Sequence, residues 1–317
     1  MLVFFNLKPP CEKISYGGGL FFVENLIDYL KSKKISVTFD LENDIDVIFI
    51  IDPRKGKFRK YDIEDIFKYK KKNPKSIIIH RINESNIKRK EGGNIEEILL
   101  KTMKNADIII FVSKWLQDYY TSKYNLDKLE NKKFLSILNG CNHTIFYPKN
   151  KSNNNKLKIV THHWSNNYFK GFEIYNELDK ILQKRNDFEF IFIGNYNPDY
   201  KPTNITLYPP CQGKELANIL RKCDVYLTAT VNEPGGAHYL EGISCGLPIL
   251  YRTNGGGVHE ICKDFGEEFK DIDSLFEKLE VLKSKSYKDD YKYLNSERCN
   301  DEYFNLILSS IKKDYIL

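Results

Sequence analysis

The stretch Asp224–Cys262, DVYLTATVNEPGGAHYLEGISCGLPILYRTNGGGVHEIC, shows how the chain is built. It predicts a strand over Val225–Thr230, a tight loop over 233–236 and a helix that runs through Glu241. A second strand over Pro248–Arg252 then leads into three glycines and a new helix start. Strands and helices in alternation form parallel sheets that are covered by helices, so the stretch predicts an α/β fold.

The same alternation runs through the rest of the chain, with one interruption. Apolar runs such as Ile35–Phe39 and Val47–Ile51 are typical of strands that are buried on both faces. The polar, asparagine-rich segment Pro148–Lys156 breaks the pattern, as an interdomain linker does, and the alternation then restarts. After Phe269 we expect only helices.

These patterns predict two Rossmann-like domains, residues 1–150 and 151–296, followed by a helical segment over 297–317. The flagged loops all follow predicted strands. Because ligands bind beyond the carboxyl ends of parallel strands, we expect the two sheets to face each other across a cleft that these loops line.

Composition limits the function classes. The chain has 317 residues, 41% hydrophobic and 29% charged, which is typical of globular domains. No apolar run is long enough to cross a bilayer, and the N-terminus lacks a secretory signal pattern. The seven cysteines form no CxxC pair, so we expect free thiols in a reduced, cytoplasmic protein.

Positive charge is concentrated in the first half of the chain. Residues 1–150 hold 27 Lys and Arg against 19 Asp and Glu, and much of the excess lies in Lys55–Lys75. This stretch is either a solvated helix face or a surface for an anionic membrane or substrate, so peripheral membrane contact stays open. No nucleic-acid-binding motif accompanies the charge, so we expect no nucleic-acid partner.

Two carboxylates, Glu233 and Glu241, bracket the loop and first helical turns of the opening stretch. Carboxylates accept strong hydrogen bonds and suit the hydroxyl groups of a sugar or ribose. Gly235 and Gly236 have no side chains, so a ligand can approach the backbone there. The combination predicts a site for a hydroxyl-rich, anionic ligand such as a nucleotide sugar.

The motifs EPGG through Glu241, CGLP at 245–248 and GG through Glu260 resemble the signature of family 4 glycosyltransferases, which have the GT-B fold. The resemblance covers most of the chain. Further similar segments are LNGCN at 138–142, FKGF at 169–172, GGG at 17–19, HRINE at 80–84 and VSKW at 112–115.

The resemblance implies a metal-independent, retaining transfer of a sugar from a nucleotide diphosphate sugar to an acceptor. Glu241 would hold the ribose hydroxyls, Glu233 the donor sugar and Lys170 the diphosphate. The first domain would bind the acceptor, which is a glycan, a lipid-linked group or a protein. The second would bind the donor, UDP- or GDP-linked, with no cofactor. The last helix would pack back on the first domain.

One position departs from the family pattern. An arginine usually stands where this chain has His163, and histidine is a weaker, pH-dependent cation. His163 could still bind the nucleotide sugar, or Arg81 or Arg252 could supply the missing charge. His162 and His163 could also be structural.

Candidate residues in the first domain are His80 and the glycine loop. His80 follows a predicted strand and could orient a hydroxyl or act as a base. Gly18 and Gly19, with Gly17, could let the backbone approach the diphosphate or the sugar. Asp44–Asp46 and Asp271–Asp273 have the DxD pattern, but their positions beside a buried strand and at a helix start disfavour metal binding.

The sequence therefore predicts a glycosyltransferase, with two alternatives. One is a sugar-nucleotide epimerase on the same fold. The other is a nucleotide-sugar-binding protein without turnover, which the altered arginine position keeps open. The sugar, the base, the acceptor and the oligomeric state are not determined by the sequence.

Overall fold

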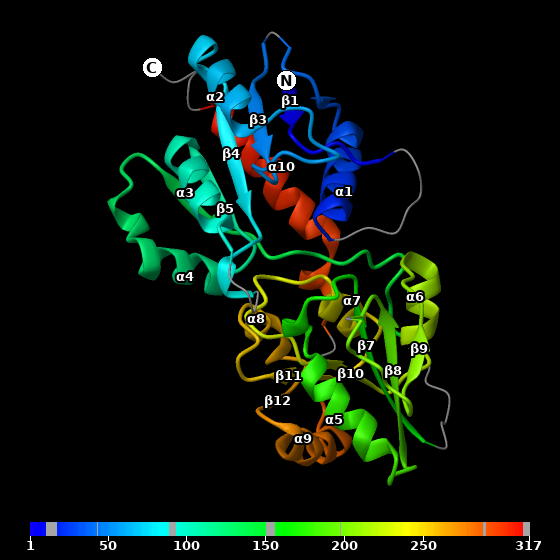
Figure 1. Ribbon diagram of the computed structural model, residues 1–317. Helices are drawn as coiled ribbons and strands as arrows, with labels where there is room; N and C mark the ends of the chain where they lie inside the picture. The colour runs from blue at the N-terminus through cyan, green and yellow to red at the C-terminus, as the bar shows by residue number, and fades with distance from the viewer. Residues whose placement is uncertain are drawn as a thin grey trace. The chain divides into compact units, whose positions relative to one another are not determined.

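The computed structural model describes residues 1–10, 18–42, 44–88, 93–149, 156–196, 198–287 and 290–312 (Figure 1). Three parts of the sequence predictions, Gly17, the linker residues 150–155 and residues 313–317, lie outside this part of the chain. The chain divides into two compact units. Unit 1 comprises Met1–Asn86, Gly93–Leu138 and Glu297–Leu317, and unit 2 comprises Ile87–Gly92 and Asn139–Ser296.

The second unit starts earlier than the sequence pattern suggests, at Asn139 instead of residue 151. Hydrogen bonds explain this difference. The Cys141 amide donates to the Leu294 carbonyl (2.7 Å) and the Ser296 amide donates to the Cys141 carbonyl (2.8 Å). Gly140 lies so close to Ser296 that an added Cβ would be 2.5 Å from its Cα. The segment before the predicted linker is therefore anchored within unit 2.

The described strands of unit 1 form a parallel sheet with the order β2-β1-β3-β4-β5-β6. The apolar strand patterns lie where the sequence predicts them, and β3, β4 and β5 are buried along most of their length. The strand bounds are β1 Leu2–Phe5, β2 Ser36–Thr38, β3 Val47–Ile50, β4 Ile77–Ile82, β5 Ile108–Phe111 and β6 Lys133–Ser136.

Helices cover both faces of this sheet (Figure 1). Apolar side chains of α1 and α10 pack on one face, and those of α2, α3 and α4 pack on the other. The last long helix thus contributes Tyr303 and Ile307, both fully buried, to the core of the first half of the chain. The helix bounds are α1 Gly18–Ser32, α2 Ile63–Lys72, α3 Ile95–Asn105, α4 Lys114–Tyr124 and α10 Ser296–Lys312, with short 3-10 turns η1 Asn86–Lys88 and η2 Leu126–Lys128.

The described strands of unit 2 form a second parallel sheet with the order β12-β11-β10-β7-β8-β9. The strand bounds are β7 Leu157–His163, β8 Phe188–Gly194, β9 Thr206–Tyr208, β10 Val225–Thr228, β11 Ile249–Arg252 and β12 Gly266–Phe269. Two six-stranded parallel sheets confirm the predicted α/β class. The sequence pattern missed β12, because its letters GEEF are half polar, as suits an edge strand.

In unit 2, helices flank the loops of the stretch Asp224–Cys262. Apolar residues of α5 and α9 pack on one face of the sheet. The short α7 packs beside β10, where an added Cβ on Gly242 would be 2.3 Å from the Tyr226 ring. The helix bounds are α5 Phe172–Leu182, α6 Gly213–Leu220, α7 His238–Ser244, α8 His259–Cys262 and α9 Ile272–Ser284, with 3-10 turns η3 Tyr168–Lys170 and η4 Lys292–Leu294.

Candidate functional site

The strand order of unit 2 places a topological switch point between β7 and β10. Counted within the unit, its strands follow the order 3-2-1-4-5-6 of the dinucleotide-binding fold. Chain connections leave β7 and β10 in opposite directions, which opens a crevice beyond their carboxyl ends. The candidate site is therefore defined by His162 and His163, the last two residues of β7, and by Glu233 in the loop after β10.

The Glu233 loop is held in place by the glycine triplet. The Glu233 amide donates to the Gly255 carbonyl (3.0 Å), and the Gly257 amide donates to the Glu233 carbonyl (2.8 Å). Gly256 has φ +75°, and an added Cβ would lie 2.8 Å from the Glu233 carbonyl oxygen. Glycine is needed there for both reasons. The NGGG segment thus holds the Glu233 loop by backbone hydrogen bonds, which fixes the position of the Glu233 side chain.

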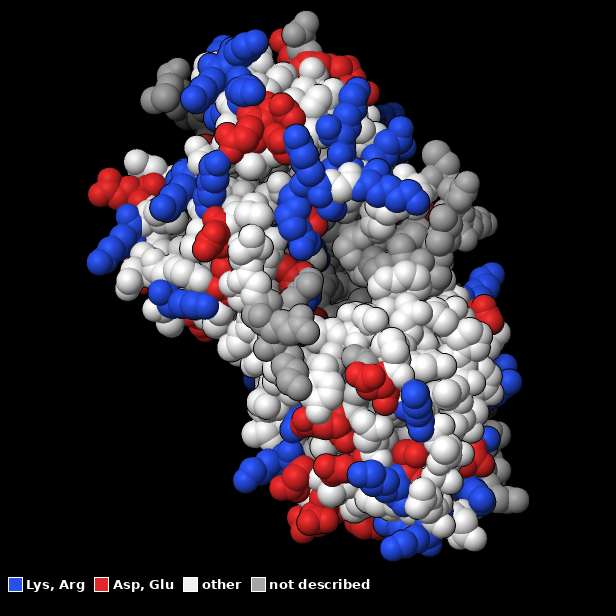
Figure 2. Space-filling model, in the orientation of Figure 1, with Lys and Arg blue, Asp and Glu red and all other residues white. Residues whose placement is uncertain are grey.

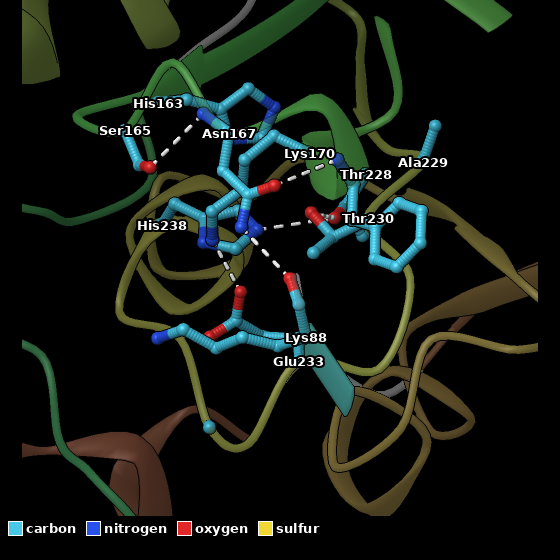
Figure 3. A network of polar contacts seen from close by, with 12 residues as sticks. Lys88, His163, Ser165, Asn167, Lys170, Thr228, Ala229, Thr230, Glu233 and His238 are labelled. Carbon is cyan, nitrogen blue, oxygen red and sulfur yellow. Dashed lines mark hydrogen bonds and ion pairs between the residues drawn. The ribbon is translucent and has the colours of Figure 1, made fainter. Parts of the chain in front are cut away.

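Lys170 reaches Glu233 because Gly171 allows a close approach of two backbones. Gly171 has φ +100°, and an added Cβ would lie 2.4 Å from Cβ of Ala229 after β10. The Val231 amide also donates to the Phe169 carbonyl (2.8 Å). In this geometry the Lys170 ammonium and the Glu233 carboxylate form an ion pair (Figure 3). The structure brings together two residues that the sequence analysis assigned to one donor site.

The Glu233 carboxylate is ionised although it is buried. Burial raises its pKa, but the positive charges of Lys170 and Lys88, together with the Lys170 hydrogen bond, outweigh this and hold the pKa below its usual value. An ionised carboxylate only accepts hydrogen bonds. Glu233 is therefore suited to accept from hydroxyl groups of a ligand.

Glu241, on α7, is paired with His162, a residue for which the sequence analysis did not decide between a structural and a functional role. His162 Nε2 lies 2.6 Å from Glu241 Oε2, and His162 Nδ1 lies 3.0 Å from the Tyr226 hydroxyl. A carboxylate only accepts, so the imidazole donates from Nε2 and can accept from Tyr226 at Nδ1. This relay fixes the orientation of Glu241, whose side chain keeps 17% exposure.

His163 is buried in this structure, in surroundings that do not suit a replacement for the missing arginine. Its ring is 3% exposed, with Nε2 2.8 Å from the Tyr175 hydroxyl. Burial, with the charges of His238 and Lys170, holds its pKa well below the usual histidine value. A neutral buried ring supplies no positive charge to a diphosphate. The structure therefore speaks against His163 as a cation for the nucleotide sugar, and any other contact of His163 with this ligand stays a prediction.

The two glycines after Glu233 serve packing within unit 2. The Gly235 carbonyl accepts from Asn139 Nδ2 (2.8 Å). An added Cβ on Gly236 would lie 2.6 Å from the His238 ring. His238 is itself buried, with Nε2 3.1 Å from Thr228 Oγ1, and burial holds its pKa well below the usual value. The predicted contact of these glycines with a ligand stays a prediction.

An open pocket lies at the carboxyl ends of β7, β8 and β9. Its volume is about 850 Å³, within the range of small-molecule sites. Three aromatic side chains that line it are unusually exposed for their size: Trp164 (44%), Tyr196 (43%) and Tyr208 (40%). The aromatic faces and the backbone of Gly194–Asn195 offer stacking and hydrogen-bonding surfaces for a flat ring.

In unit 1, His80 lies on β4 and is fully buried. Neither ring nitrogen has a hydrogen-bond partner among the described residues. Burial lowers the pKa of His80 to about 3, although the Asp52 charge opposes this. A ring with this pKa is a poor general base near neutral pH, so the structure speaks against the catalytic role that its position after a strand suggested.

The other candidates of the first domain have different surroundings. Gly18 and Gly19 begin α1, and a Cβ on Gly18 would meet no described atom within 4 Å. Arg81 is buried against Tyr303 and stacks on Phe22, 3.9 Å from the ring centroid. The predicted glycine contact with a ligand stays a prediction, and Arg81 belongs to the core of unit 1.

Other charged motifs have structural partners. Arg252 forms an ion pair with Glu173 in unit 2. Asp271 caps α9 by accepting from the Ser274 amide (3.0 Å), and Asp46 accepts from the Leu2 amide (2.7 Å). No group of histidine, cysteine and acidic residues in the described ranges has an arrangement suited to hold a metal ion.

The basic stretch is partly neutralised. Figure 2 shows Lys and Arg side chains on unit 1, interleaved with Asp and Glu. Lys55 pairs with Asp62 (2.9 Å), and Lys60 pairs with Asp40. Among the described helices, none is both long and apolar enough to span a bilayer.

Sequence reasoning missed three features of the site. Lys88 belongs to unit 2 and acts on Glu233, yet nothing in its surroundings (NIKRK) marks it in the sequence. His238 was read only as part of a helix. Trp164, directly after the two histidines, is a large exposed aromatic beside a strand end, a signal that was available.

Comparisons with known proteins agree on the fold. No protein-family model and no curated protein matches the chain. Sucrose-phosphate synthase from Thermosynechococcus elongatus superposes with a TM-score of 0.69 at 13% identity, over 97% of this chain and 98% of that one. A glycosyltransferase from Rickettsia africae gives 0.68 at 13% identity, over 98% of both chains. HepE from Anabaena, solved with UDP and glucose, gives 0.60 at 12% identity, over 99% and 98%.

At such low identities the similarity establishes a shared fold. That fold is the GT-B arrangement of two parallel α/β sheets, in agreement with the fold predicted from the sequence.

Proposed function

We propose that the chain is a retaining glycosyltransferase that moves a sugar from a nucleotide diphosphate sugar to an acceptor, without a metal. One observation carries this proposal: a buried, ionised carboxylate, Glu233, is paired with the ammonium of partly buried Lys170 at the switch point of unit 2. A diphosphate sugar offers a group for each of them, an anion for the lysine and hydroxyls for the glutamate.

Donor binding exchanges the internal ion pair for two ligand contacts. The Lys170 ammonium turns to the diphosphate, and the Glu233 carboxylate accepts from a hydroxyl of the donor sugar. During transfer the bond between the anomeric carbon and the phosphate oxygen breaks, and its electron pair stays on the phosphate. A preformed ammonium stabilises that growing charge more than it stabilises the ground state, which accelerates the reaction.

Glu241 and the aromatic pocket take the nucleoside. The relay through His162 orients the Glu241 carboxylate toward the ribose hydroxyls. The base stacks in the pocket near Trp164 and Tyr208, with its edge against the backbone of Asn195. UDP is the first nucleotide to test because the structural neighbour HepE was solved with UDP and glucose, and GDP is the second.

A donor panel tests the proposal. The protein is incubated with UDP- and GDP-linked sugars and a set of glycan, lipid-linked and peptide acceptors, with EDTA present. Release of the nucleotide with formation of a glycoside of unchanged anomeric configuration, read by NMR, is the expected result. Complete loss of activity in EDTA, restored by Mn²⁺ or Mg²⁺, would contradict metal independence.

The same incubation separates the two alternatives. Binding of the nucleotide sugar without release of nucleotide indicates a binding protein, which the absence of an arginine at position 163 keeps open. An epimerised sugar formed without any acceptor, whether still linked to the nucleotide or free, indicates an epimerase.

Peripheral contact of the basic first unit with anionic membranes is tested by vesicle flotation. Because several lysines are already paired, we expect weak and salt-sensitive binding.

A further inference from the structure

Lys88 lies far before the other site residues in the sequence but belongs to unit 2. It ends the 3-10 turn η1, and two side chains of the site loops hold this segment. Asn167 Nδ2 donates to the Lys88 carbonyl (2.8 Å), and Asn232 Nδ2 donates to the Ile87 carbonyl (3.3 Å). Asn167 precedes the turn that carries Lys170, and Asn232 directly precedes Glu233. The backbone of Lys88 is therefore attached to both loops that carry the charged pair.

The side chain of Lys88 acts on the same carboxylate as Lys170. Figure 3 shows the Lys88 side chain running beside Glu233. After burial, which raises the pKa of Glu233, the charges of Lys170 and then Lys88 are the main influences that lower it. Two ammonium groups thus surround one carboxylate.

The positive charge beside this carboxylate comes from lysines and not from the neighbouring histidines. The nearby rings of His163 and His238 are neutral near pH 7, because burial holds their pKa values well below the usual histidine value. Lys170 and Lys88 are the two cations that act on ionised Glu233. In a partly desolvated position an ammonium group attracts an anion more strongly than it would in water.

We propose that Lys88 is the second cation of the donor site and binds the diphosphate together with Lys170. This inference rests on the proposed function. When the glycosidic bond of the donor breaks, its electron pair moves to the phosphate oxygen, and both ammonium groups face the added charge. The acceptor oxygen forms the new bond to the anomeric carbon, and its proton passes to the departing phosphate. The missing arginine is thus replaced by a lysine from another segment of the chain.

Calorimetry with UDP, UMP and uridine, and with GDP, GMP and guanosine, tests the proposal. Lys88→Ala should weaken binding of the preferred nucleoside diphosphate by about tenfold, the amount that the loss of a hydrogen bond to a charged group causes. Affinity for the nucleoside should not change, and the salt dependence of diphosphate binding should become shallower. Lys88→Arg should retain most of the affinity.

Lys180→Ala is the matched control, because Lys180 is an exposed lysine on α5 of the same unit. It removes the same net charge and should leave diphosphate affinity unchanged. Equal diphosphate affinities of Lys88→Ala and wild type, with both proteins folded by circular dichroism, would overturn the inference and leave the proposed function intact. If the wild type binds no nucleoside diphosphate, the proposed function fails, and the role of Lys88 fails with it.

Discussion

At the switch point of unit 1, between β1 and β3, one polar side chain bonds to the local backbone and the others pair within one loop. Asn6 donates to the Asp52 carbonyl (2.7 Å) and accepts from the Ile51 amide (2.9 Å). The Asp52 carboxylate takes two hydrogen bonds from the Arg54 guanidinium (2.9 and 2.8 Å) and an ion pair from Arg59 (3.2 Å). These groups hold together the loops that follow the strands.

At the switch point of unit 2 the polar groups instead pair with one another across loops. Lys170 with Glu233, and His162 with Glu241, join segments that only the tertiary structure brings together. Their partners can be exchanged for groups of a ligand, and an open pocket lies at the ends of the neighbouring strands. The two sheets thus differ at the same topological position. In unit 1 the polar groups bond to the backbone or within one loop, whereas in unit 2 they pair between segments distant in sequence, and we expect ligand binding at the second.

Among substitutions in unit 2, Lys170→Ala should have the largest effect on turnover. We expect turnover to fall by about 10²-fold or more, as when an oxyanion-stabilising donor is removed. The pKa of Glu233 should rise, because its nearest positive charge is lost. Steady-state kinetics with the preferred donor measures the first effect. A turnover close to that of the Lys180→Ala control would remove Lys170 from the mechanism.

His162 should influence nucleotide binding through Glu241. His162→Phe removes both hydrogen bonds of the relay and should weaken nucleoside diphosphate binding by about tenfold. His162→Gln retains a donor on a side chain of similar reach and should bind better than the phenylalanine variant. His259→Phe is a matched control, since its ring lies 3.4 Å from Glu268 in a more exposed pair of the same unit. Equal affinities of the glutamine and phenylalanine variants would contradict the relay.

The buried histidines should make the protein sensitive to acid. The pKa of His80 is about 3 in the folded chain, against 6.5 for the exposed ring, so the unfolded chain binds more protons below pH 6.5. The stabilising effect of the neutral ring is complete above pH 6.5 and is lost as the pH falls toward 3. At pH 5 this group should lower the free energy of unfolding by about 2 kcal/mol.

His163 and His238 shift in the same direction and should add to this loss. Urea unfolding of wild type and His80→Leu at pH 7 and pH 5 measures the His80 contribution. The leucine variant should lose less stability between the two values. Identical losses would show that His80 is accessible to protons in the folded chain.

A substitution of Asn6, in unit 1, tests the other half of the comparison, because it should change stability and not nucleotide binding. Asn6→Ala leaves the buried Ile51 amide without its hydrogen-bond acceptor and should lower the free energy of unfolding by about 1–2 kcal/mol. Nucleotide affinity should stay unchanged. Thermal unfolding and calorimetry on the same sample measure both quantities. A loss of nucleotide affinity without a loss of stability would remove the distinction between the two switch points.

The sequence predicted the fold well because strand runs such as Val47–Ile50 and Ile108–Phe111 are apolar throughout and are interrupted by helical periods. It missed β12, since an edge strand with two glutamates lacks that apolar pattern. The predicted start of the second domain lies later in the chain than the observed one, because tertiary hydrogen bonds attach the segment Asn139–Cys141 to unit 2.

The site was predictable in part for a similar reason. Short motifs contain Lys170, Glu233 and Glu241, and close backbone approaches require the glycines of these motifs. The sequence pattern therefore indicates the local geometry. Lys88 stands in no such motif, and its position beside Glu233 depends on a segment that joins unit 2 from a distant part of the chain. The burial of His80 and His163 also depends on packing that single strand-end positions do not reveal.

Titration calorimetry of UDP, GDP and ADP against the wild type and Glu241→Ala tests the central claim, that the switch point of unit 2 binds the nucleotide of the donor. The account predicts that one nucleoside diphosphate binds with one site per chain, in the presence of EDTA, and that Glu241→Ala weakens this binding about tenfold or more. Equal affinity of the variant and the wild type, or no binding of any of the three, would contradict it.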